Sequence, residues 1–63
     1  MLEQNDIYVG RPLLYLIGEE KWYTTVTNKE EEGFWLFFSD GDTCFVWYEY
    51  DMTLVAPLET KWE

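Results

Sequence analysis

The residues of this 63-residue chain that could do chemistry are almost all carboxylates. There are 13 Asp and Glu residues, no His, and a single cysteine, Cys44. Without an imidazole the chain has no general base of the usual kind, and nothing to activate the Cys44 thiol as a nucleophile. Paired carboxylates can hydrolyse glycosides, but that reaction needs a deep cleft, which we do not expect in a domain of this size. We therefore expect a protein that is not an enzyme.

Metal and cofactor sites are also not expected. Asp40 and Asp42 have the spacing of the first two ligands of a calcium loop, but the other ligands and the terminal Glu are missing at the required positions. A zinc site would need about four Cys or His ligands. A single cysteine allows no intrachain disulfide, and the longest apolar run, residues 13–17, is far shorter than the roughly 20 residues of a membrane helix. We expect a cytoplasmic protein.

The charge of the chain restricts its partners. Four Lys and Arg residues against 13 Asp and Glu give a net charge of −9. Such a surface repels phosphates and anionic lipids, which argues against direct binding to nucleic acid or membranes. Nine of the carboxylates fall in or beside predicted turns: Glu19, Glu20, Glu30, Glu31, Glu32, Asp40, Asp42, Glu49 and Asp51. They indicate a protein partner with a basic surface, or alternatively they keep an aromatic-rich domain soluble.

The elements that position these residues are predicted to be strands. Hydrophobic residues make up 48% of the chain and aromatic residues 21%, which predicts a folded domain despite the charge. They occur in short runs without helical periodicity, separated by Gly, Asp, Asn and Glu. The sequence therefore predicts a single all-β domain over residues 1–63. Its five strands are expected at residues 12–17, 21–27, 34–38, 43–48 and 54–56, with Pro57 ending the last.

The third and fourth strands are predicted to form a hairpin with two apolar faces. If Asp40-Gly41 is a two-residue turn, one face holds Trp35, Phe37, Cys44, Val46 and Tyr48, and the other holds Phe34, Leu36, Phe38, Phe45 and Trp47. A small barrel buries only one face of each strand. The second face then lies under a terminal segment, carrying Ile7 and Tyr8 or Trp62, or it contacts a partner. We expect Phe34, Phe45 and Trp47 to be aromatic anchors for that partner, which could be a second copy held by Phe34, Leu36, Phe45 and Trp47.

Several segments resemble tudor domains of the SH3-like barrel class. They are Tyr8-Val9-Gly10, Trp22-Tyr23 before Val26, Leu36 to Gly41, Cys44 with Val46, and Leu54 to Leu58, so the resemblance covers about residues 8–58. It implies a small five-stranded barrel. It also implies a cage in which aromatic rings and one carboxylate hold methylated lysine or arginine, at Tyr23, Phe38 and Asp40. The tryptophan expected near the end of the first strand is replaced by Leu16 or Ile17, and the tyrosine expected after the turn glycine is Asp42.

These observations lead to three candidate functions. The first is a non-enzymatic acidic protein-binding module, an inhibitor of the phage or mobile-element type. It would occupy the basic nucleic-acid-binding surface of a host defence protein, as anti-CRISPR and anti-restriction proteins do. If a phage encodes the chain, we expect to find it in the host cytoplasm. The alternatives are a methyl-lysine or methyl-arginine reader of the tudor type and a subunit of a homo-oligomer or complex.

Overall fold

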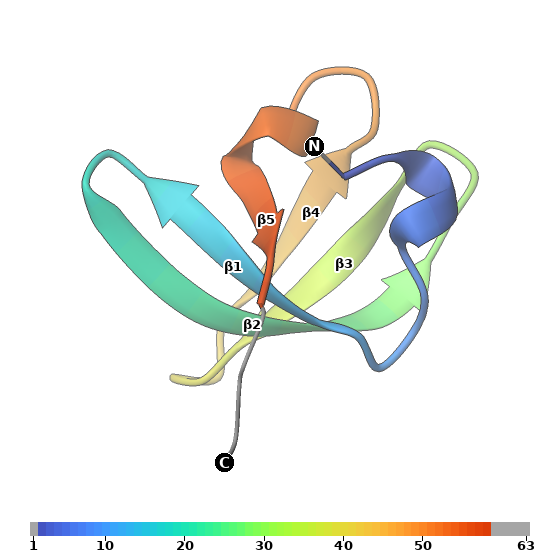
Figure 1. Ribbon diagram of the computed structural model, residues 1–63. Coiled ribbons are helices and arrows are strands. Elements are labelled where there is room, and N and C mark those ends of the chain that lie inside the picture. The colour runs from blue at the N-terminus through green and yellow to red at the C-terminus, as the bar shows by residue number, and fades with distance from the viewer. Residues whose placement is uncertain (1, 59–63) are drawn as a thin grey trace, which may run out of the picture.

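The computed structural model describes residues 2–58, whose five strands form one antiparallel sheet (Figure 1). The strands are β1 (Pro12–Ile17), β2 (Glu20–Lys29), β3 (Gly33–Phe38), β4 (Thr43–Trp47) and β5 (Val55–Pro57). β1 to β4 follow one another as a meander and β5 pairs with β1, so the strand order is β4-β3-β2-β1-β5. The predicted all-β fold with five strands is confirmed. Each predicted strand overlaps an observed one, and β2 is the strand that extends furthest beyond its prediction.

The sheet is curved but not closed into a barrel. β4 and β5 are its two end strands, and they do not pair with each other within the described residues. The expectation of a closed five-stranded barrel is therefore wrong on this point. Most of the curvature follows β2, which sweeps beneath the rest of the molecule in Figure 1. Its register with β3 shifts between Val26 and Asn28, which leaves Thr27 as an extra residue in β2. An extra residue of this kind bends a strand and increases its twist.

The core lies on the concave face of this sheet. Successive side chains of a strand point to opposite faces of the sheet, so only every second residue of a strand can face the core. The buried apolar strand residues are Leu13, Val26, Phe34, Leu36, Phe38, Val46 and Val55. Thr24 is the buried polar residue among them, and its hydroxyl donates to the Leu13 carbonyl at 2.9 Å.

The N-terminal segment adds two apolar residues to this core. Leu2 and Ile7 are buried in the same apolar cluster, on either side of the short 3₁₀ helix η1 (Gln4–Asp6). Lys29 Nζ donates to the Ile7 carbonyl at 2.9 Å and so ties the segment to the end of β2. The expectation that Ile7 and Tyr8 cover the face of Phe34, Leu36 and Phe38 is confirmed for Ile7, which is buried in the same cluster as that face, and wrong for Tyr8, which is 58% exposed. Trp62, the other candidate cover, lies outside the described residues.

The β3–β4 turn contains one residue more than a two-residue turn. The amide of Gly41 donates to the Phe38 carbonyl at 3.0 Å, and the amide of Phe38 donates to the Asp42 carbonyl at 2.8 Å. Gly41 has φ = +100°, which is the left-handed position of a three-residue hairpin loop with a bulge.

The predicted pairing of β3 with β4 is therefore wrong by one residue. Phe34 pairs with Val46 and Trp35 with Phe45. The concave side of the hairpin holds Phe34, Leu36, Phe38, Cys44 and Val46, and the outer side holds Trp35, Phe37, Phe45 and Trp47. The chain then forms a second 3₁₀ helix, η2 (Met52–Leu54), before β5. Within residues 2–58 there is no helix with the length and apolar character needed to cross a membrane.

Candidate aromatic cation pocket

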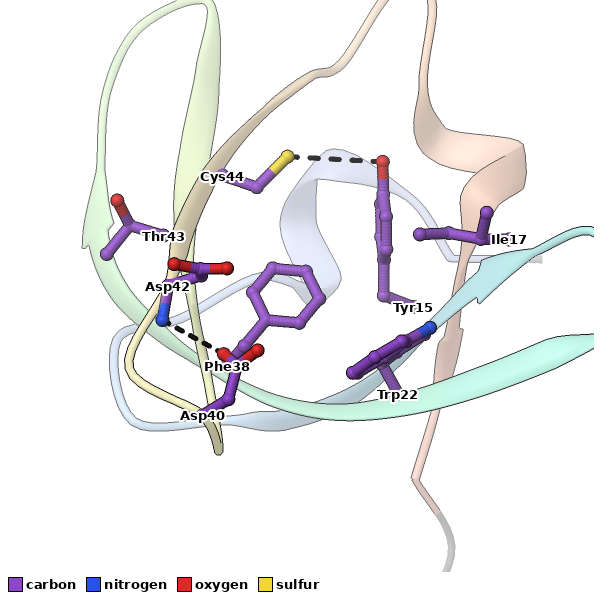
Figure 2. A pocket seen from close by; sticks show the side chains of 8 residues that line it. All are labelled: Tyr15, Ile17, Trp22, Phe38, Asp40, Asp42, Thr43 and Cys44. Atoms are coloured by element: carbon purple, nitrogen blue, oxygen red, sulfur yellow. Dashed lines mark hydrogen bonds between the residues drawn. The ribbon is translucent and has the colours of Figure 1, made fainter.

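A pocket opens beside β1, the start of β2 and the β3–β4 turn (Figure 2). Its volume of about 340 Å³ is at the small end of the range for ligand sites, which suits a side-chain head group. Three aromatic side chains and two carboxylates are among the residues that line it. The full lining is Tyr15, Ile17, Trp22, Phe38, Asp40, Asp42, Thr43 and Cys44.

The register of the sheet brings the three rings together. Tyr15 and Trp22 are cross-strand partners on β1 and β2, and Phe38 pairs with Thr24 further along β2. The Tyr15 and Phe38 ring centroids are 5.5 Å apart at 86°, and those of Trp22 and Phe38 are 6.2 Å apart at 71°. These edge-to-face contacts are favourable in themselves and hold the rings at steep angles to Phe38. They therefore form the apolar walls of the pocket.

Two carboxylates border the pocket on the side of the turn. Figure 2 shows Asp40 and Asp42 on one side of Phe38, with Tyr15 and Trp22 on the other. Asp40 Oδ1 accepts a hydrogen bond from the Asp42 amide at 3.0 Å, which fixes the turn, while both side chains stay exposed. Negative charge beside aromatic faces favours an organic cation, because the rings attract it through their quadrupoles and the carboxylates through their charge.

Polar groups in the wall of the pocket complete its chemistry. The Cys44 thiol donates to Tyr15 Oη at 3.9 Å. Burial raises the pKa of the Tyr15 hydroxyl above its usual value, and the neighbouring Cys44 raises it further. Trp22 Nε1 is buried without a hydrogen-bond partner among residues 2–58, an uncommon state for an indole N–H. The pocket wall therefore carries an unused donor.

Only some of the residues predicted to form the cage line the pocket. Phe38 and Asp40 line the pocket, but Tyr23 is 64% exposed and lies on the opposite face of β2. Placing Tyr23 in the cage is wrong because successive strand residues alternate in direction, so Trp22 faces the pocket in its place. Counting back in twos from buried Val26 along the strand selects Trp22. Sequence reasoning misses Tyr15 and Cys44. Nothing in the sequence around them shows which distant segments they contact in the folded chain.

The predicted acidic residues lie in separate groups. Asp40 and Asp42 flank the aromatic pocket. Glu31, Glu32 and Glu49 line a second hollow, together with Gln4, Trp47, Tyr48 and Tyr50. Glu19 and Glu20 lie at the β1–β2 turn, Glu30 is exposed at the end of β2, and Asp51 is half-buried and accepts the Trp47 amide at 3.3 Å.

The predicted aromatic anchors divide between the two faces of the sheet. Phe34 and Leu36 are completely buried in the core, so their assignment to a partner-binding face is wrong. Phe45 is half-buried and Trp47 is 42% exposed, both on the outer side of β4. The error follows from the turn, since a shift of one residue in register moves every side chain of a strand to its other face.

Within residues 2–58 there is no group of three or more Cys, Asp or Glu side chains arranged to hold a metal ion. No family model, curated protein or solved structure matches this chain. The case for a function therefore depends on the geometry of the site.

Proposed function

We propose that this protein is a non-enzymatic binding module whose pocket holds the cationic head group of a lysine or arginine side chain, with preference for the methylated forms. The observation that carries this proposal is the convergence of Tyr15, Trp22 and Phe38 with two carboxylates around one pocket. Cation–π contacts contribute about 0.5–1 kcal/mol at exposed sites and about 2 kcal/mol or more when desolvated. Methylation favours entry because a methylated head group loses less hydration than a free ammonium.

A tudor-like relationship is part of this proposal. It is supported by the five-stranded antiparallel sheet, in which a meander of four strands is followed by β5 beside β1, and by a pocket that combines Phe38 and Asp40 with aromatic residues of the first two strands. Trp22 supplies the ring expected from Tyr23. The carboxylate of Asp42 stands where the family has a tyrosine, so this pocket has more negative charge and one ring fewer at the turn.

The test is a titration with peptides that carry trimethyl-lysine or dimethyl-arginine, followed by NMR. We expect the indole resonance of Trp22 and the ring resonances of Phe38 to shift on binding. Trp22→Ala should abolish binding, whereas Tyr23→Ala, an adjacent aromatic residue on the other face, should leave it unchanged. Because Trp22 also packs against the core, Asp42→Asn provides a milder variant at an exposed position and should weaken binding several-fold.

Two results would contradict the proposal. One is a titration in which neither peptide shifts the indole resonance of Trp22 or the ring resonances of Phe38. The other is binding that survives in a folded Trp22→Ala variant and is lost in Tyr23→Ala, which would place the ligand on the opposite face of β2.

A second candidate function is inhibition of a protein that binds nucleic acid through a basic surface. It is favoured by the net charge of −9 and by carboxylates on three separate turns, which match an extended basic surface better than a single basic side chain. The immobilised protein should retain nucleic-acid-binding proteins from a lysate, and duplex DNA should release them. Retention should also fall as salt approaches about 0.5 M, where the screening length is about 4 Å. Retention that is indifferent to both DNA and salt would exclude this function.

A further inference from the structure

The outer side of the β3–β4 hairpin carries four aromatic side chains, here called the outer ladder. Its members are Trp35, Phe37, Phe45 and Trp47. The ring centroids of Trp35 and Phe45 are 5.2 Å apart, and those of Phe45 and Trp47 are 4.9 Å apart, both edge-to-face. Phe37 remains 45% exposed and Trp47 42% exposed. Contiguous apolar surface of this kind on a small domain is typical of an interaction site.

The outer ladder is held in place by its neighbours. The Phe45 ring lies over Gly33, where a Cβ atom would be 2.8 Å from Phe45 Cζ and 2.9 Å from Cε2. Trp35 Nε1 donates to Glu30 Oε2 at 3.1 Å. Side chains that are already ordered lose little conformational entropy when a partner binds, which improves their contribution to affinity.

Carboxylates border the outer ladder at the end where β3 begins and β4 ends. Glu30 contacts Trp35, and Trp47 lines the second hollow, of about 460 Å³, together with Glu31, Glu32 and Glu49. The backbone at this end is tied together by the Tyr48 amide, which donates to the Glu32 carbonyl at 3.1 Å. The nearest basic residue in the sequence, Lys29, directs its ammonium group to the carbonyls of Gln4 and Ile7. The acidic border is thus available to positive charge from a partner.

We propose that the outer ladder and its acidic border form a docking surface for a lysine- and arginine-rich segment of a protein partner. Guanidinium planes and aliphatic stems would lie against Trp47 and Phe45, and the charged head groups would reach Glu31, Glu32 and Glu49. Aromatic anchors of this kind supply most of the affinity of an interface, while the surrounding charges steer association. A second copy of the chain is the less favourable occupant, because it brings a charge of −9 against a charge of −9.

This surface is separate from the aromatic pocket. The outer ladder projects from the convex side of β3 and β4, whereas Tyr15, Trp22 and Phe38 project from the concave side. The proposal therefore does not rest on the pocket, and the indole resonances of Trp47 and Trp22 report on the two sites separately.

The experiment uses a deca-arginine peptide as the probe and measures its affinity for the full chain at low salt. Trp47→Ala should weaken binding about tenfold or more, whereas Tyr8→Ala, at another exposed aromatic position, should have little effect. Phe37→Ser serves as a second variant if Trp47→Ala unfolds. In NMR of the wild type, the deca-arginine peptide should shift the Trp47 indole resonance, and a titration that shifts only the Trp22 indole and the Phe38 ring resonances would place the peptide in the pocket alone and overturn the proposal.

Two charge variants separate a local border from the overall charge. Glu31→Gln with Glu32→Gln, and Glu19→Gln with Glu20→Gln, each change the net charge from −9 to −7. We expect the first pair to weaken binding by about two- to tenfold more than the second. Equal losses would show that only net charge matters and would overturn the proposal. So would sedimentation showing that the free protein self-associates through Trp47, because the ladder would then be a contact between copies.

Discussion

Gly33 provides a quantitative test of the arrangement that orders the outer ladder. A Cβ atom at this position would overlap the Val46 carbonyl oxygen and would lie 2.8 Å from Phe45 Cζ, whereas ordinary contacts begin at 3.4 Å. The ring must therefore retreat by about 0.6 Å, and no side-chain rotation relieves the backbone contact. Gly33 has no positive φ, so Gly33→Ala would otherwise gain about 0.4–1 kcal/mol from the unfolded state.

Overpacking of this kind costs about 1–3 kcal/mol. A domain of this size has a total stability of about 3–9 kcal/mol, so the loss is a large fraction of it. In urea, where small proteins have slopes of about 1 kcal/mol/M, we expect the unfolding midpoint of Gly33→Ala to fall by about 1–3 M. The Trp47 indole resonance should shift as well, because Phe45 contacts Trp47 edge-on.

Two comparisons isolate the cause. A Cβ atom at Gly18 would meet nothing within 4 Å, but this residue has a φ of +58°, so Gly18→Ala should cost about 1–2 kcal/mol through backbone strain and leave the Trp47 resonance in place. In a Phe45→Ala background the cost of Gly33→Ala should shrink by at least about 0.5 kcal/mol, since the ring contact is gone. A Gly33→Ala protein within about 0.5 kcal/mol of the wild type would refute the described packing of β3 against β4.

Two further predictions concern stability. Ile7→Ala should lower the free energy of unfolding by about 2–5 kcal/mol because Ile7 is 1% exposed, whereas Val9→Ala at a 59% exposed position should change it by less than about 0.5 kcal/mol; equal effects in urea unfolding would show that the N-terminal segment is not part of the core. Burial raises the pKa of Tyr15 and Tyr48 in the folded state above the usual value of 10.0. Their contribution to the free energy of unfolding is therefore complete below pH 10 and is lost as the pH rises through the raised pKa, because the buried hydroxyls must then ionise. Unfolding measured at increasing alkaline pH should therefore show a smaller loss of stability in Tyr15→Phe than in Tyr23→Phe, and the reverse order would contradict the assignment.

The strands are predictable because the signal for them is local. Runs of β-branched and aromatic residues between turn-forming residues mark β1 to β5, and the range predicted for the first strand, residues 12–17, has the observed bounds. The pairing of β3 with β4 is not predictable from the Asp40-Gly41 dipeptide. Gly41 can serve a two-residue or a three-residue loop, and the choice shows only in the hydrogen bonds that Phe38 makes with Gly41 and Asp42.

The site is harder to predict than the strands because apolar residues occupy both faces of the sheet. Where polar and apolar residues alternate, the face of each residue can be read from the sequence; at Trp22-Tyr23 both residues are aromatic and the alternation gives no direction. Phe38 and Asp40 are found through the resemblance. To predict Trp22 one must know which residues of β2 face the core, and to predict Tyr15 one must know that it pairs with Trp22 across the strands.

The sequence by itself determined a small, acidic, all-β domain, because composition, charge and strand propensity act residue by residue and need no knowledge of neighbours in space. Only the tertiary structure decided which aromatic side chains enter the core, which line the pocket and which remain on the outer ladder. One additional loop residue at Gly41 turned Phe45 and Trp47 outward, and the fold of the N-terminal segment beside the end of β2 brought Ile7 into the core. These outcomes depend on pairing between distant segments, where a shift of one residue exchanges the two faces of a strand.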